Sequence, residues 1–180
     1  LTARHLFTEF GTAGGTVTFD NMAISDGGNE IGKRVNGEDY AVHDAILINI
    51  TSSNYTPTSE IDDETAQING VVTKDAIAYF ASNDTTIHRR GQVTGSETHS
   101  VHSHDHYDQA SGIEDLVIYN GPYGKSGDSG GIYYYKSDSS SAYISSIHSG
   151  DLNPDDDDAD IDYPAGAAGY ALTNHGLSFS

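Results

Sequence analysis

The sequence predicts an all-β protein, on three observations. Residues that favour strands are frequent, including 12 Tyr and 5 Phe, and they are interspersed with 20 Gly. No stretch of ten or more residues carries the apolar repeat of 3.6 residues that an amphipathic helix needs. Short alternating or aliphatic runs recur instead, separated by Gly, Asn and Asp. At 180 residues the chain is long enough for one sizeable core or two small ones.

The expected strands follow from alternation of apolar and polar residues or from continuous aliphatic runs. The clearest run lies in residues 40–50, where consecutive aliphatic side chains are typical of a strand buried on both faces. Residues 83–86 form the predicted crossing between two halves of the chain. The strands expected in chain order are residues 16–19, 40–50, 71–80, 86–95, 101–107, 113–120, 132–135, 142–150 and 166–172.

The charge of the chain excludes one class of function. It carries 27 acidic residues against 8 basic ones, a net charge of −19. Nucleic-acid binding needs a basic surface and is therefore not expected. No stretch approaches the length of a membrane span, so no membrane association is expected either. Two explanations of the acidity stay open: adaptation to brine, as in a halophile, or a merely solubilising surface. With no cysteine, the redox compartment cannot be inferred.

Residues 124–131 have the composition of a nucleophile loop. Ser129 stands between glycines, which let the backbone turn sharply and leave the hydroxyl accessible. Main-chain N–H groups that converge in such a turn can stabilise a developing oxyanion. Glycine-rich loops more often simply connect strands, so the loop alone does not establish catalysis.

Two clusters raise the question of metal binding. In a regular strand His102, His104 and His106 would share one face and could hold zinc, copper or nickel. An exposed edge with solvated imidazoles is the favoured interpretation, so no metal site is assigned. Residues 151–162 are rich in Asp, yet they lack the glycine and distal glutamate of an EF-hand, which favours a solvated acidic loop over a calcium site.

Three ordered motifs resemble those of the chymotrypsin-like serine proteases. Residues 1–5, Leu-Thr-Ala-Arg-His, are similar to the family's Leu-Thr-Ala-Ala-His segment. Residues 43–48 are similar to its Asp-Ile-Ala-Leu segment, and residues 127–131, Gly-Asp-Ser-Gly-Gly, match its nucleophile loop. Residues 90–95 resemble the strand that opens the second barrel of secreted bacterial members. Among the members of the family, the sequence is most similar in its motifs to secreted bacterial proteases of the glutamyl endopeptidase type.

The resemblance implies a catalytic triad and an oxyanion hole. Ser129 would attack the scissile carbonyl, and His5 would take and return its proton. Asp44 would orient the imidazole and stabilise its charged form. The N–H groups of Gly127 and Ser129 would bind the oxyanion, in a loop fixed by Asp128.

The resemblance also implies a fold of two Greek-key antiparallel β-barrels. Residues 1–84 would form the first barrel, with the histidine and aspartate, and residues 85–180 the second, with the nucleophile and the substrate pocket. In the family, strands precede the histidine, and there is no room for them before His5. We therefore expect the first barrel to lack its N-terminal strands here, either because the sequence is a fragment of a longer precursor or because the barrel itself is incomplete.

Substrate preference stays open between two alternatives. Tyr123 occupies the position where trypsin-type members carry an acid, which argues against a Lys or Arg preference. His148 falls where glutamyl-specific members place a histidine, and Lys125 is near the expected pocket mouth, so a Glu or Asp preference is one choice. Otherwise His148 is structural, and the pocket takes apolar or aromatic side chains. The substrate-binding residues implied by the resemblance are Tyr123, Lys125, His148, Ser149, Gly150 and Gly169.

The resemblance therefore implies a secreted, monomeric serine endopeptidase that acts on protein or peptide substrates through an acyl-enzyme, without a cofactor. The alternative is a non-catalytic acidic extracellular β-domain, a binding or surface module that retains the same fold. Loss of a triad residue would mark that alternative, and all three residues are present in the sequence.

Overall fold

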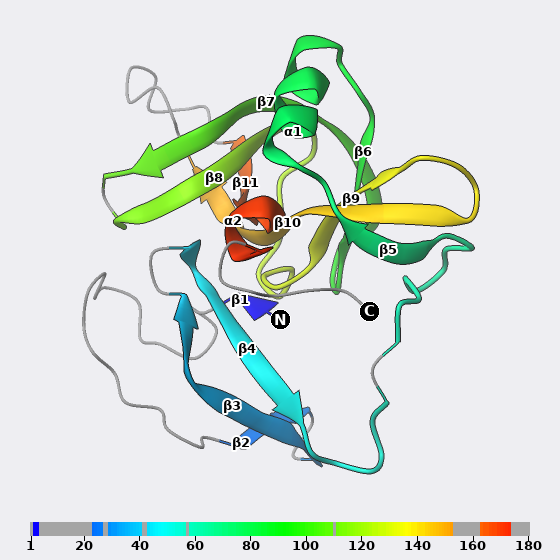
Figure 1. Cartoon of the computed structure of the whole chain (residues 1–180), viewed down its shortest axis with the longest axis vertical. Helices are drawn as coiled ribbons and strands as arrows, with labels where there is room; N and C mark the ends of the chain where they lie inside the picture. The colour runs from blue at the N-terminus through cyan, green and yellow to red at the C-terminus, as the bar shows by residue number, and fades with distance from the viewer. Residues whose placement is uncertain are drawn as a thin grey trace.

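The computed structural model describes residues 2–3, 23–26, 29–40, 43–56, 58–109, 111–152 and 163–173. Within them the chain is mostly β-strand, arranged as two largely antiparallel sheets that lie one above the other in Figure 1. The predicted strand at residues 16–19 and the aspartates of residues 155–162 lie outside the described residues. Among the described helices, none is long and apolar enough to cross a bilayer.

The first sheet has four strands in the order β1-β4-β3-β2. Asp26 pairs with Asn29 where β2 and β3 meet. Ala3 of β1 pairs with Ala45 at the start of β4, which brings the N-terminal segment beside the aliphatic strand. The strands are β1 (Thr2–Ala3), β2 (Ala23–Asp26), β3 (Asn29–Tyr40) and β4 (Ala45–Ile50).

The second sheet closes on itself. Its strand order is β11-β8-β7-β6-β9-β10-β5, and β10 also pairs with β11, so that six antiparallel strands, β6 to β11, form a barrel. The remaining strand, β5, runs parallel to the start of β10. Closure leaves these six strands paired on both sides. The strands are β5 (Gln67–Val71), β6 (Ile87–Gly91), β7 (Gly95–Asp108), β8 (Ile113–Asn120), β9 (Ile132–Lys136), β10 (Ser141–Leu152) and β11 (Tyr163–Ala168).

The barrel interior is built from alternating strand residues. Along β6, Ile87, Arg89 and Gly91 are buried while the residues between them are partly exposed, the two-residue period that a strand imposes. Tyr119 of β8 stacks on Tyr133 of β9, with ring centroids 4.0 Å apart, and both residues are fully buried. Stacked aromatic side chains thus form part of the barrel interior.

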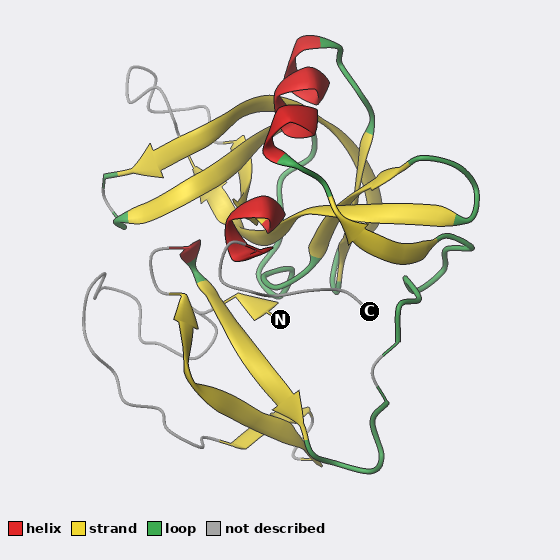
Figure 2. Cartoon of the chain, viewed as in Figure 1, coloured by secondary structure: helices red, strands yellow, loops and turns green. Residues whose placement is uncertain are grey.

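Two segments predicted as strands are helical at least in part (Figure 2). Residues 71–80 were expected as a strand, whereas helix α1 spans Lys74–Ser82. The Thr73 side chain accepts a hydrogen bond from the Ala76 N–H and caps the helix. Ile77 and Phe80, three residues apart, bury one face of it. A short apolar face is enough to stabilise this helix because α1 packs on the barrel. This packing outweighs the strand propensity of the segment.

The last predicted strand, residues 166–172, is also divided. Strand β11 ends at Ala168, and a short helix, α2 (Gly169–Thr173), continues from it. Residues 113–120 match β8 at both ends, residues 86–95 are divided by a turn at residues 92–94, and the other expected strands from residue 86 onward are present with shifted ends. The described elements also show that β5, which precedes residue 84, belongs to the second sheet.

Candidate active site

The loop between β8 and β9 presents Ser129 in a turn held from two sides. Gly127 and Gly130 have φ of +102° and +85°, a region that favours glycine. The Asp128 N–H donates to the Lys125 carbonyl at 2.9 Å, and the Gly131 N–H donates to the Asp128 carbonyl at 2.9 Å. These bonds make two successive tight turns around Ser129.

Strand β10 clamps the same loop. The Gly130 N–H donates to the His148 carbonyl at 2.9 Å, and the His148 N–H donates to the Gly131 carbonyl at 2.8 Å. His148 is therefore fixed next to Ser129 through its backbone. Gly131 also lets the loop lie close against β6, because a Cβ there would lie 2.6 Å from the Arg90 carbonyl oxygen.

Asp128 anchors the loop to the barrel. Its carboxylate accepts hydrogen bonds from the N–H groups of Val93 (2.7 Å), Thr94 (3.0 Å) and Lys125 (2.8 Å), and the residue is fully buried. Burial acts to raise the pKa of Asp128, but the backbone N–H donors prevail and lower it to about 2. The ionised carboxylate thus joins the β6–β7 turn to the serine loop.

The predicted triad is described in part. Asp44 lies in a turn directly before β4, is 4% exposed, and has φ of +50°, a conformation that Asp tolerates better than most residues. Ser129 lies in the loop above. His5 lies outside the described residues.

Most of the predicted substrate-binding residues surround the serine loop. Tyr123 is exposed at the start of the loop, and Lys125 is exposed beside it. Ser149 and Gly150 follow His148 at a register shift of β10, and a Cβ at Gly150 would meet open space. Gly169 begins α2, where a Cβ would lie 2.6 Å from the Val71 side chain and 3.2 Å from the carbonyl oxygens of Ile144 and Ser145.

The three candidate metal ligands are not brought together. The pairing of β7 with β8 shifts register between Val101 and Ser103 and again between Ser103 and His106, so the side chains do not keep one face. His102 stacks on Tyr163, and His104 lies 3.4 Å from Asp105. Within the described ranges, no group of three or more His, Asp or Glu side chains is placed to hold a metal ion.

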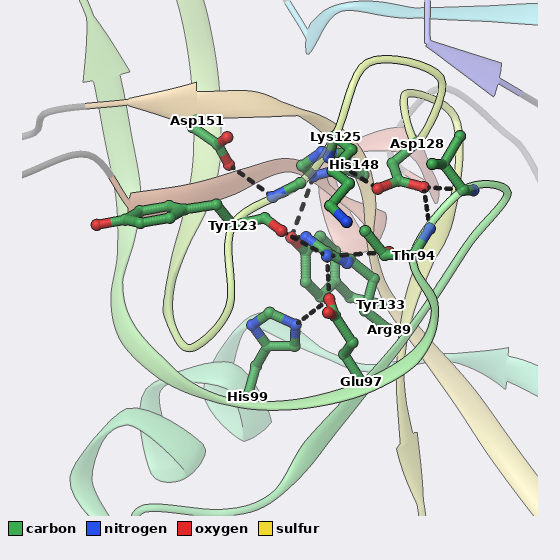
Figure 3. Close-up of polar contacts among 12 residues, drawn as sticks. Arg89, Thr94, Glu97, His99, Tyr123, Lys125, Asp128, Tyr133, His148 and Asp151 are labelled. Atoms are coloured by element: carbon green, nitrogen blue, oxygen red, sulfur yellow. Dashed lines mark hydrogen bonds and ion pairs between the residues drawn. The ribbon is translucent and has the colours of Figure 1, made fainter.

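Arg89 is the main site residue that the sequence did not single out. Its side chain is fully buried, and it ion-pairs with Glu97. It also donates to the Thr94 hydroxyl (3.2 Å), the Tyr123 carbonyl (3.1 Å) and the Tyr133 hydroxyl (3.4 Å). The Tyr133 hydroxyl in turn lies 3.1 Å from His148 Nδ1 (Figure 3). The signal in the sequence was a pair of arginines among only 8 basic residues, in a strand whose alternation must turn one of them inward.

His99 packs edge-on against Tyr133. Its ring centroid is 5.3 Å from that of Tyr133, and its Nε2 is 4.0 Å from the Glu97 carboxylate. Burial, together with the positive charge of Arg89, lowers the pKa of His99 to about 4. The imidazole is therefore neutral at physiological pH.

Comparison with known proteins supports the fold assignment. No family model and no curated protein matches the sequence. Solved structures do match, and they are bacterial-type serine proteases: the chain has the fold of the chymotrypsin-like serine proteases. The predicted two-barrel fold class and the resemblance stated from the motifs are thereby confirmed at the level of the fold.

Three of these structures align over most of the chain. A glutamic acid specific serine protease described as using a histidine triad in substrate binding has a TM-score of 0.58 at 16% identity, over 88% of this chain and 78% of that one. Thermobifida fusca protease A has a TM-score of 0.57 at 17% identity, over 82% and 77%. A Nocardiopsis protease has a TM-score of 0.56 at 18% identity, over 97% and 80%.

Proposed function

We propose that the protein is a serine endopeptidase that hydrolyses peptide bonds through Ser129, His5 and Asp44. The observation that carries the proposal is the serine loop: a Gly-Asp-Ser-Gly-Gly turn held by the buried Asp128 carboxylate and by the backbone of His148. Such a turn fixes the main-chain N–H groups around a nucleophile before substrate arrives, the arrangement that stabilises an oxyanion.

The pairing of β1 with β4 supports a role for His5. Ala3 pairs with Ala45, the neighbour of Asp44. His5 follows Ala3 by two residues, and two extended residues span about 7 Å at most. The chain can therefore deliver the imidazole to the vicinity of Asp44.

In the proposed reaction Ser129 Oγ attacks the scissile carbonyl while His5 accepts its proton. The tetrahedral oxyanion receives hydrogen bonds from the Gly127 and Ser129 N–H groups. His5 then gives its proton to the leaving amine, and an acyl-enzyme forms on Ser129. Water, deprotonated by His5, hydrolyses that ester and regenerates the serine.

A preference for Glu or Asp at the position before the scissile bond is the favoured choice. The His148 backbone is bonded to the serine loop, Lys125 lies in that loop, and the buried Arg89 donates to the Tyr123 carbonyl at the start of the loop. The structural neighbour specific for glutamic acid is described as using histidines for substrate binding, and here His148 and His99 both contact the Tyr133 ring.

Secretion of the protein, and its action as a monomer, also belong to the proposal.

Labelling with a fluorophosphonate probe tests the catalytic proposal. We expect covalent labelling of the purified protein and its loss in Ser129→Ala. Ser126→Ala, in the same loop, is the matched control and should still be labelled. Absence of labelling and hydrolysis in a folded protein would favour the non-catalytic β-domain instead.

A further inference from the structure

Three consecutive buried residues form the turn before β4, and the two outer ones both reach the second sheet. His43, Asp44 and Ala45 are 6%, 4% and 0% exposed. Ala45 packs in a hydrophobic cluster with side chains of β10 and α2. His43 reaches β8, where its Nδ1 lies 3.4 Å from the Glu114 carbonyl oxygen and 3.7 Å from the Asp115 carboxylate. Asp44 is therefore held between two contacts to the other sheet, at the boundary where Figure 1 shows the start of β4.

A β-bulge in β8 presents both partners of this imidazole. His106 and Asp108 of β7 pair with β8 residues that are three positions apart. Glu114 and Asp115 therefore lie together opposite a single residue of β7, the arrangement that defines a bulge and re-aims the groups it contains. Asp115 has φ of +53°, in the left-handed region that Asp tolerates. The bulge thus turns a carbonyl and a carboxylate of β8 toward the first sheet.

The chemistry of the two partners places the hydrogen on the imidazole. A backbone carbonyl and a carboxylate only accept hydrogen bonds, so His43 Nδ1 carries a hydrogen and donates it. An Nδ1–H is present in one tautomer of the neutral ring and also in the charged ring. The contact between the sheets therefore does not depend on whether His43 is charged. Because the ring is buried, water competes little for this bond.

The strand that receives His43 also carries the nucleophile loop. Strand β8 ends at Asn120, and the loop that contains Ser129 follows it directly. His43 thus fastens the Asp44 turn close to the start of the strand from whose end the serine loop extends. A displacement of the first sheet against the second would have to break or stretch this hydrogen bond.

We infer that His43 is a positioning residue, whose Nδ1–H, held by the bulge of β8, fixes the Asp44 turn relative to the serine loop. This inference rests on the proposed protease function and deepens it. In that function Asp44 orients the imidazole of His5, and a displacement of about 1 Å in such an arrangement can lower the rate on the order of 100-fold. His43 acts through Asp44 and not on the substrate. Its loss should therefore lower kcat and leave KM nearly unchanged.

Two substitutions of different chemistry at His43 test the inference. His43→Leu removes the donor but still fills the buried site, and we expect kcat to fall about 30-fold with a change in KM below about twofold. His43→Asn places an amide N–H close to the position of Nδ1–H, so kcat should return to within about threefold of the wild type. His88→Leu, at a half-buried histidine of β6, is the control and should keep the wild-type kcat. Equal kcat in His43→Leu and His43→Asn would overturn the inference.

Asp115→Gly tests the same contact from the other side. Glycine adopts a positive φ without strain, so the substitution removes the carboxylate and leaves the bulge in place. We expect kcat to fall about fivefold, less than in His43→Leu because the Glu114 carbonyl still accepts. Asp84→Gly is the matched control, because Asp84 is exposed and also has a positive φ, of +46°. It should leave kcat unchanged.

The double variant decides whether the two side chains act through one contact. If they do, His43→Leu combined with Asp115→Gly should lose no more kcat than His43→Leu alone. Losses that multiply would show that the two residues act independently, which would overturn the inference.

Two measurements in the inactive Ser129→Ala background test the contact without hydrolysis. Long-range ¹⁵N–¹H correlation should show His43 protonated at Nδ1, and amide hydrogen exchange in β4 should become faster on adding His43→Leu but not on adding His43→Asn. Protonation at Nε2 alone, or equal exchange in all three proteins, would refute the contact even in an active protease. Absence of fluorophosphonate labelling in a wild type that shows both signatures would instead remove the protease function and leave the contact between the sheets established.

Discussion

The two sheets hold their candidate catalytic residues in different ways. In the second, the loop of Ser129 is fastened within its own barrel, by Asp128 to the β6–β7 turn and by main-chain bonds to β10. In the first, Asp44 lies in a turn at the head of β4, next to Ala45. Ala45 belongs to a hydrophobic cluster with Ile144, Ile147 and Leu172 of the second barrel. The nucleophile loop is thus preorganised locally, whereas the position of Asp44 depends on how the sheets pack together.

The largest effect should come from removing the anchor of the serine loop. Asp128→Ala leaves the buried N–H groups of Val93, Thr94 and Lys125 without their acceptor, and we expect a loss of about 4 kcal/mol in the free energy of unfolding. Labelling of Ser129 should fall as well. Urea unfolding measures the first quantity and fluorophosphonate kinetics the second.

Asp138→Ala is the control for this change. Asp138 also accepts a backbone N–H in a loop, from Ser140 at 2.7 Å, but it is exposed. Its loss should cost less than about 1 kcal/mol because water replaces the bond. Equal losses for the two variants would show that burial of Asp128 is not what fixes the loop.

Acid should destabilise the barrel through His99. Burial and the charge of Arg89 hold the pKa of His99 at about 4, against 6.5 for the ordinary group. The unfolded chain therefore takes up a proton as the pH falls below about 6.5, while the folded chain does not until about pH 4. Stability should decrease over this window, by roughly 3 kcal/mol from this residue.

The variant His99→Gln isolates that contribution. It should flatten the pH dependence of the free energy of unfolding between about pH 6.5 and pH 4, compared with the wild type. Tyr119→Phe weakens the same core without removing the imidazole, so it should keep the wild-type slope. If the slope is unchanged in His99→Gln, the buried imidazole is not the group that titrates.

The smallest effect should come from disturbing the contact between the sheets. Ala45→Leu overfills the cluster of Ile144, Ile147 and Leu172 at a cost of about 2 kcal/mol. Because Asp44 adjoins Ala45, hydrolysis should fall more than the stability of the second barrel does. Hydrogen exchange of β6 to β11, measured beside kcat/KM, distinguishes the two effects.

Asn49→Leu provides the comparison for that variant. Asn49 is exposed on the same strand, so the substitution should change both quantities little. Equal loss of hydrolysis in Ala45→Leu and Asn49→Leu would mean that the packing at Ala45 does not control the position of Asp44.

Local patterns predicted most strands and the serine loop. They failed where tertiary packing determines whether a segment is helix or strand, or on which face of a strand a side chain lies. Residues 71–80 contain Val71 and Val72 at one end and a capped alanine-rich segment at the other, and the barrel surface selected the helix for the second part. The histidines of residues 102–106 were assigned to one face on the assumption of regular pairing. The register shifts of β7 against β8 removed that regularity.

The sequence by itself determined the all-β character, the glycine-flanked Ser129 and the order of the motifs, because turn chemistry and a two-residue period are local properties of the chain. The tertiary structure alone decided that Arg89 rather than Arg90 points inward, and that it meets Tyr133 and His148. Alternation says that one of two adjacent side chains is buried, but not which one. Closure of the barrel makes that choice, because it brings together strands separated by more than forty residues and leaves each buried donor to find its acceptor there.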